Sequence, residues 1–132
     1  MTLEFHPNLG TILICDFATG FHPPEMVKKR PVVVVSSRDR VNGEVLTVIP
    51  LSTAKPAIIH PWHCGIDTSM MPPHFREKET WAKCDMIITV ACWRLDRMRE
   101  KVEGKRVYSA PVINSEDLTA IQQGIKAHLN LT

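Results

Sequence analysis

Residues 24–36 read Pro-Glu-Met-Val-Lys-Lys-Arg-Pro-Val-Val-Val-Val-Ser, a charged segment that runs directly into an apolar one. The β-branched run Val32–Ser36 predicts the strongest strand of the chain. Because polar residues do not alternate within it, burial on both faces or a central place in a closed barrel is expected. Pro31 fixes its own φ and biases Arg30 towards an extended backbone. Arg30 is therefore expected at a strand entrance, where a guanidinium can hold a phosphate through two parallel hydrogen bonds.

The composition fits one globular domain that spans residues 1–132, with 44% hydrophobic and 23% charged residues. Sixteen Lys and Arg against fourteen Asp and Glu give a net charge of +2, which neither marks nor excludes a nucleic-acid binder. The four cysteines form no CxxC pair, and no apolar run approaches the ~20 residues of a membrane helix. These features predict a soluble, cytoplasmic protein with reduced thiols and no membrane partner.

Short β-prone runs follow one another along most of the chain. They are expected at 11–16, 45–49, 79–85, 86–92 and 106–108, in addition to the valine strand. Residues 18–29 are expected to form a loop, Asn42-Gly43 is a hairpin turn signal, and Pro50 is expected to end the strand before it. Residues from about 54 to 78, rich in proline and histidine, are expected to be a long excursion with little regular structure.

The C-terminal segment has the pattern of an amphipathic helix. Asn114 or Ser115 is a suitable N-cap, with acidic residues following in the first turn. Apolar residues then recur at spacings of three and four, at Leu118, Ile121, Ile125 and Leu129. Short strands, tight turns and a terminal helix together predict a mainly β protein, an antiparallel barrel or sandwich capped by a helix.

Three groups of residues are candidates for chemistry at the strand ends. They are Arg30, the hydroxyl pair Ser52 and Thr53, and the pair Lys83 and Asp85, which a strand would place on one face roughly 7 Å apart. A cation, hydroxyls and a carboxylate suit RNA cleavage, in which a base activates the ribose 2′-hydroxyl and a cation stabilises the phosphoryl charge. From the sequence pattern alone, Arg30 is more commonly a surface salt-bridge partner and Ser52-Thr53 an ordinary turn or cap, and Lys83 and Asp85 can neutralise each other on a sheet face.

The excursion contains His60, His63, Cys64 and His74, which are natural zinc ligands. Their spacing matches no structural zinc pattern, so no metal is expected. A flap packed by Trp62 and Phe75 is the simpler interpretation. A flap near the binding groove would let His60 or Trp62 stack on an unpaired base. Trp81 and Trp93 are expected in the core or in a dimer interface.

Taken in order, these motifs resemble the PemK/MazF family of toxins from type II toxin–antitoxin systems. The resemblance rests on Gly10–Leu13, Asp16-Phe17, Glu25 with Arg30-Pro31, the valine strand, Val48–Thr53, and Lys83–Asp85 with Thr89-Val90. It extends from about Gly10 to the C-terminal helix.

The resemblance implies an SH3-like barrel that forms a homodimer, cleaves single-stranded RNA without a cofactor and is inhibited by a cognate antitoxin. The family's arginine falls on Arg30, its hydroxyl residue on Ser52 with Thr53 beside it, and the carboxylate base of the PemK/Kid branch on Asp85. Lys83 stands where that branch has arginine, so bidentate phosphate binding is lost there. Substrate contacts are expected from Lys83, Glu25, Lys29, His60 and Trp62.

Two other functions fit the same barrel. One is a non-catalytic module that binds RNA or a protein, which the lysine at position 83 and the long excursion favour. The other is a toxin that poisons a protein such as gyrase, because a family with that activity shares this fold. Fold alone does not separate these functions.

Overall fold

The computed structural model describes residue 5, residues 7–36 and residues 44–131. Within these residues the chain forms β1 (Ile12–Asp16), β2 (Lys29–Val34), β3 (Val45–Ser52), β4 (His63–Ile66), α1 (Pro73–Arg76), β5 (Thr80–Lys83), the 3₁₀ helix η2 (Cys84–Met86), β6 (Ile88–Ala91), the 3₁₀ helix η3 (Cys92–Arg94), β7 (Leu95–Asp96), β8 (Met98–Val102), β9 (Lys105–Ser109) and α2 (Ser115–Leu129). The predicted turn at Asn42-Gly43 lies outside the described residues.

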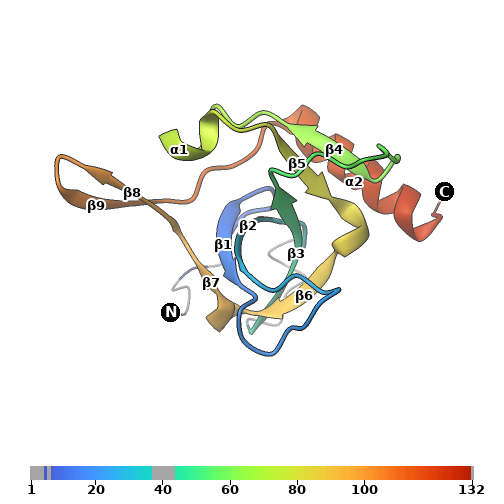
Figure 1. The fold of residues 1–132 in the computed structure, drawn as a ribbon, viewed down its shortest axis with the longest axis horizontal. Coiled ribbons are helices and arrows are strands. Elements are labelled where there is room, and N and C mark those ends of the chain that lie inside the picture. The colour runs from blue at the N-terminus through green and yellow to red at the C-terminus, as the bar shows by residue number, and fades with distance from the viewer. Residues whose placement is uncertain (1–4, 6, 37–43, 132) are drawn as a thin grey trace.

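The main sheet is antiparallel and has the strand order β4-β5-β3-β2-β1-β7, with β6 paired to β3 as well. Figure 1 shows β1, β2, β3, β6 and β7 curled around a common centre, while β4, β5 and α2 lie on one side of this ring. The ladder stays open at β4 and β7 in the part of the chain that the structure describes. The prediction of a mainly β fold with a C-terminal helix is confirmed, with an incompletely closed barrel.

The valines of β2 explain why this strand is central. Val33 packs with Ile12 and Ile49 in one core cluster, while Val32 and Val34 belong to a second cluster on the other face. All three valines are fully buried, as the unbroken apolar run predicts.

Two strand boundaries differ from the predicted ones. β2 begins at Lys29 and ends at Val34, so Arg30 lies within the strand, opposite Cys15 of β1. β3 does not end at Pro50 but continues to Ser52. On one side of β3, pairing with β6 ends at Val48 and pairing with β5 begins at Leu51. Pro50 falls between them, where no ladder partner needs an N–H, so proline is tolerated.

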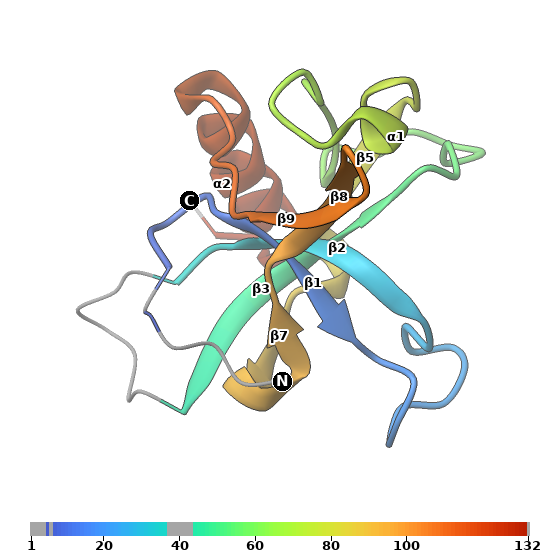
Figure 2. The same cartoon turned by 90° about the vertical axis from the view of Figure 1, so that its left-hand side faces the viewer.

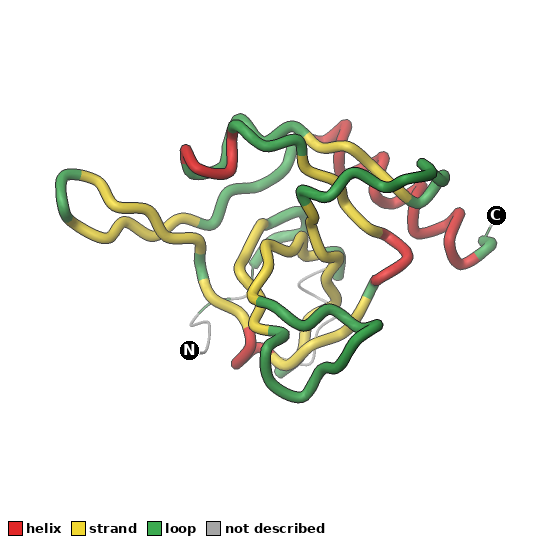
Figure 3. Tube along the Cα trace, in the orientation of Figure 1, coloured by secondary structure: helices red, strands yellow, loops and turns green. Residues whose placement is uncertain are grey.

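The excursion after β3 is more regular than predicted. It contains β4, which pairs with β5 along its whole length, and the single turn α1. Pairing with a neighbour far along the chain forms β4, and this is not visible in a local pattern. Figure 3 shows the loops that flank β4 on one side of the ring and the loop between β1 and β2 on the opposite side.

The segment 79–92 is also divided differently from the predicted pair of strands. β5 ends at Lys83, and Asp85 lies in η2, so the two side chains do not share a strand face. β6 covers only Ile88–Ala91, and Cys92 begins η3. The 3₁₀ turns break the period of two on which the predicted pair depended.

Helix α2 begins as predicted, because the Asn114 side chain accepts a hydrogen bond of 2.7 Å from the Asp117 N–H. Ile121 is buried, but Leu129 is 49% exposed and does not share the buried face. Trp81 is buried as expected for a core residue, whereas Trp93 is 53% exposed and is not in the core of this chain.

The pair β8 and β9 forms a separate two-stranded sheet. In Figure 1 this hairpin extends away from the barrel, and Figure 2 shows it lying beneath α1. The predicted last strand at 106–108 is therefore confirmed, as part of β9. Among the described helices none has the length and apolar character needed to cross a membrane.

Candidate active site

The register of β2 and β3 brings two of the predicted residues together. Val32 lies opposite Pro50, so continuing the antiparallel register by two residues places Arg30 opposite Ser52. Both line one cavity of about 260 Å³ at the end of these strands. The full lining is Lys28, Lys29, Arg30, Pro31, Leu51, Ser52, Thr53, Met71, Phe75, Lys78 and Thr80. We call it the Arg30 cavity.

Arg30 is a partly buried cation with an unsatisfied donor in the part of the chain that the structure describes. Its Nε is buried without a hydrogen-bond acceptor, and no carboxylate among the described residues pairs with its guanidinium. Leaving a buried donor unsatisfied costs free energy, so such groups are usually paired. A bound anion would supply the missing acceptor and the missing opposite charge.

The electrostatics of the Arg30 cavity favour such an anion. Lys28, Lys29 and Lys78 line it together with Arg30, and none of its lining residues is acidic. Cations on the walls of a cleft reinforce one another and concentrate negatively charged ligands there.

The hydroxyls complete this cavity. Ser52 is only 6% exposed, and its Oγ accepts a hydrogen bond of 3.1 Å from the Ala54 N–H. Because its oxygen already accepts a bond, the hydroxyl proton is left to donate to a ligand. Thr53 is exposed at the rim.

The carboxylates lie elsewhere. Asp85 and Glu25 line a second cavity of about 190 Å³, together with Phe17, Phe21, Met26, Pro50, Met86, Ile87 and Ile88. The two cavities are neighbours along β3, since Pro50 lines one and Ser52 the other. The structure thus groups Arg30, Lys29, Ser52 and Thr53, and sets Asp85 and Glu25 apart from them.

The remaining predicted contacts line neither of these two cavities. Lys83 lies at the end of β5 opposite His63. His60 stacks on Trp62 with ring centroids 4.5 Å apart, and the Trp62 ring is 5.9 Å from that of His128 in α2. These aromatic residues therefore pack beside the terminal helix.

The histidines and cysteine of the excursion do not converge on a metal site. His63 Nδ1 accepts from the His60 N–H at 3.0 Å, and the Cys64 thiol donates to the Ala120 carbonyl at 3.3 Å. Among the described residues no three His, Cys, Asp or Glu side chains gather closely enough to hold a metal ion.

The thiols are poor candidates for a nucleophile. Burial raises the pKa of Cys15 to about 12 and also raises that of Cys92. A hydrogen bond shared with Cys64, together with burial, raises the pKa of Cys84, and the same bond lowers the pKa of Cys64. Cys64 lies beneath α2, so none of the four combines a lowered pKa with an open position.

Sequence reasoning missed the residues that the excursion contributes. Met71, Phe75 and Lys78 close one side of the Arg30 cavity, and Lys28 adds to its charge. Lys28 belongs to the basic cluster before the valine strand, so its charge was a usable signal. The position of Lys78 depends on how the excursion folds back, for which the sequence has no local signal.

Comparison with known proteins identifies the family of this chain. The family described as "PemK-like, MazF-like toxin of type II toxin-antitoxin system" matches residues 8–129. The chain belongs to this toxin family. Among curated relatives, YifN from Escherichia coli strain K12 is 31% identical over 118 residues, covering 75% of this chain and 78% of YifN. An uncharacterized protein from Haemophilus influenzae is 35% identical over 114 residues, covering 76% and 78%.

Solved structures share the fold at low sequence identity. MazF from Deinococcus radiodurans has a TM-score of 0.68 at 15% identity, covering 97% of this chain and 100% of that one. A mycobacterial endoribonuclease in complex with its cognate antitoxin has a TM-score of 0.62 at 18% identity, covering 96% and 98%. The open barrel with a C-terminal helix is thus the architecture of MazF proteins.

Proposed function

We propose that this toxin-family protein is an endoribonuclease that cuts single-stranded RNA, including mRNA, at short sequences. The observation that carries the proposal is the buried Nε of Arg30, which has no acceptor among the described residues, in a cavity lined by cations and hydroxyls. A phosphodiester supplies the acceptor oxygens and the charge that this cavity lacks. Membership of the toxin family and the MazF fold support the same reading.

The proposed reaction needs no group outside the protein and its substrate. A base removes the proton of the ribose 2′-hydroxyl, a bond forms from this oxygen to phosphorus, and the bond to the 5′-oxygen breaks. The products are a 2′,3′-cyclic phosphate and a 5′-hydroxyl, with water supplying the proton of the leaving oxygen. No metal is required, because the attacking oxygen belongs to the RNA.

Each residue of the site has one proposed role. Arg30 stabilises the phosphoryl charge, since a guanidinium stays protonated in proteins and is a poor proton donor. Ser52 and Thr53 orient the scissile phosphate, and Lys29 neutralises the backbone next to it. Asp85 is the proposed base, with Glu25 beside it in the neighbouring cavity. Lys83, His60 and Trp62 remain predicted RNA contacts outside both cavities.

The proposal extends to partners and location. A cognate antitoxin, through an acidic segment, would hold the Arg30 cavity in competition with RNA; a related endoribonuclease and a related MazF have been solved with an antitoxin. The chain is proposed to act as a homodimer in the cytoplasm, where its RNA substrates are.

The test uses purified protein free of antitoxin, a mixed-sequence single-stranded RNA and EDTA, with cut sites mapped by sequencing. We expect cuts at one short motif, and a loss of about 10²–10³-fold in rate for Arg30→Ala, as for removal of an oxyanion donor. Asp85→Ala should lower the cleavage rate by about 10²–10⁴-fold, which is the typical contribution of a general base. Lys126→Gln, in the last turn of α2, is the matched control.

One observation favours a second candidate, a module that binds RNA without cutting it. Asp85 and Arg30 line different cavities, so the structure does not bring the proposed base to the proposed cation. RNA that is bound in an Arg30-dependent way but never cut would establish that function. Growth arrest with intact RNA, unaffected by Arg30→Ala, would instead indicate a protein target.

A further inference from the structure

We propose that the β8–β9 hairpin, together with η3, extends the RNA-binding surface and holds phosphates of the strand beyond the cut site. The inference rests on the proposed function, because it names how the same substrate continues past the Arg30 cavity. It concerns side chains that lie outside the residues grouped around Arg30.

On one face of the hairpin, two positively charged side chains lie directly opposite each other. The register pairs Arg99 with Tyr108 and Lys101 with Arg106, so these four side chains share a face. Like charges opposite each other on a sheet are destabilising. Neither Lys101 nor Arg106 pairs with a carboxylate among the described residues. This face is therefore complementary to an anion with repeated charges.

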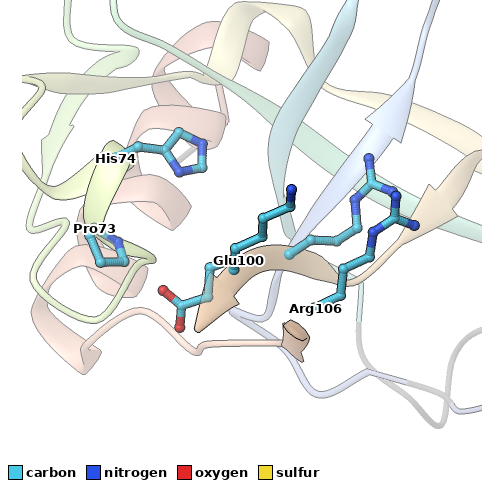
Figure 4. A pocket seen from close by; sticks show the side chains of 6 residues that line it. Pro73, His74, Glu100 and Arg106 are labelled. Atoms are coloured by element: carbon cyan, nitrogen blue, oxygen red, sulfur yellow. The ribbon is translucent and has the colours of Figure 1, made fainter. Parts of the chain in front are cut away.

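The cationic face borders a hollow in the surface. A cavity of about 450 Å³ lies between the hairpin and α1, lined by Pro73, His74, Arg99, Glu100, Lys101 and Arg106. Figure 4 shows Pro73 and His74 facing the hairpin side chains across this cavity. Glu100 is its one acidic lining residue, against three cations.

A third cavity links the hairpin cavity to the Arg30 cavity through shared lining residues. Its volume is about 420 Å³, and it shares His74 and Arg99 with the hairpin cavity. It also shares Lys29, Pro31 and Phe75 with the Arg30 cavity. The three cavities therefore adjoin one another along the surface, from the Arg30 cavity to the hairpin.

Two aromatic rings lie against cations along this path. Trp93 lines the third cavity and is 53% exposed, and the Arg94 guanidinium lies 4.5 Å from its ring centroid. The Arg97 guanidinium lies 4.8 Å from the Tyr108 ring. A basic groove with exposed rings is the surface that binds single-stranded nucleic acid, where bases stack and phosphates meet cations.

The third cavity is lined by acidic residues as well as cations. Asp16 and Asp96 line it, against Lys29, Arg94, Arg97 and Arg99. The balance remains positive, and the partly exposed side chains of Trp93 and Tyr108 add a contact that the bases of RNA use and an acidic peptide does not. We therefore assign the path to RNA.

The test compares a short RNA that carries only the mapped cleavage motif, about 5 nucleotides, with one of about 15 nucleotides. The variant is Lys101→Gln/Arg106→Gln. The matched control is Lys105→Gln/Lys126→Gln, which removes the same charge from the other hairpin face and from α2. Binding is measured by fluorescence anisotropy with a 2′-deoxy block at the cut site, and cleavage with unblocked RNA.

We expect wild type to bind the long RNA more tightly than the short one. In the variant, the ratio of these two affinities should fall about tenfold at low salt. The slope of log K against log salt should become shallower by about 1.4, because each single-strand phosphate contact contributes about 0.7. The variant should melt at the same or a higher temperature, since its like-charge opposition is relieved. A merely structural role for the pair would lower the melting temperature.

Three results would overturn the inference. The first is a variant that keeps the full preference for long RNA, and the second is an equal loss in the control. The third is a loss confined to binding of a polyglutamate peptide, which would assign the face to an acidic protein segment. If wild type neither binds nor cuts either RNA, the proposed function itself fails, which separates the two claims.

Discussion

At the scale of residues, Arg30 couples function to stability. Its Nε is buried without an acceptor, and its neighbours Lys28, Lys29 and Lys78 repel it. Folding holds this group in place through the flanking strand pairs, Cys15 with Arg30 and Val32 with Pro50. A site that is held ready for an anion is expected to be less stable without one.

Replacing this cation should therefore stabilise the protein while abolishing activity. We expect Arg30→Met to raise the free energy of unfolding by about 1 kcal/mol in urea titrations, because an unpaired charge is replaced by an apolar chain. Lys29→Met, at an exposed neighbour, should stay within about 0.5 kcal/mol of wild type. A clear loss of stability in Arg30→Met would mean that the guanidinium supports the fold.

The individual site residues show what the sequence can predict. Arg30 and Ser52 were expected at neighbouring strand ends, and the antiparallel register of β2 and β3 brings them together, although Ser52 lies within β3 and not after it. Asp85 could not be placed correctly, because the chain leaves the strand at Lys83 for a 3₁₀ turn. A period of two in the sequence does not indicate where a strand ends and a 3₁₀ turn begins.

At the scale of elements, helix α2 is held against the sheet by a close approach at Gly124. A Cβ at this position would lie 2.7 Å from Cys84 Sγ and 3.2 Å from Cys64 Sγ. The two thiols in turn donate to the Ala120 and Ile121 carbonyls. The glycine is thus required by packing, although it is a weak helix former.

Gly124→Ala should destabilise the protein despite its gain in helix propensity. Propensity favours alanine by up to about 1 kcal/mol, but overpacking of a buried contact costs about 1–3 kcal/mol. We expect a net loss in thermal or urea unfolding, whereas Gln123→Ala on the exposed face should be neutral or stabilising. In a Cys84→Ala background the cost should shrink, and equal costs in both backgrounds would refute the contact.

The elements differ in how far local sequence determines them. Helix α2 was predictable because Asn114 is its cap and the spacing of its apolar residues is helical. The valine strand was predictable because burial on both faces leaves no polar alternation. Strand β4 was not, because it forms only where β5 pairs with it and α2 covers it.

At the scale of the whole molecule, a net charge of only +2 hides an uneven distribution. Cations line three adjoining cavities from the Arg30 cavity to the hairpin, while Asp85 and Glu25 lie in a separate cavity. Sequence composition alone could not indicate this separation, which follows from the sheet topology and the projecting hairpin. This arrangement suits the binding of one extended polyanion across the Arg30 cavity.

The central claim is that this surface cuts RNA through the ribose 2′-hydroxyl beside Arg30. The most direct measurement compares two RNAs of the mapped motif, which differ only by a 2′-deoxy substitution at the cut nucleotide, with EDTA present. The account predicts that wild type cuts the all-ribose RNA to a 2′,3′-cyclic phosphate and a 5′-hydroxyl, and leaves the deoxy RNA intact although bound. Equal cutting of both RNAs, or binding of both without any cut, would contradict it.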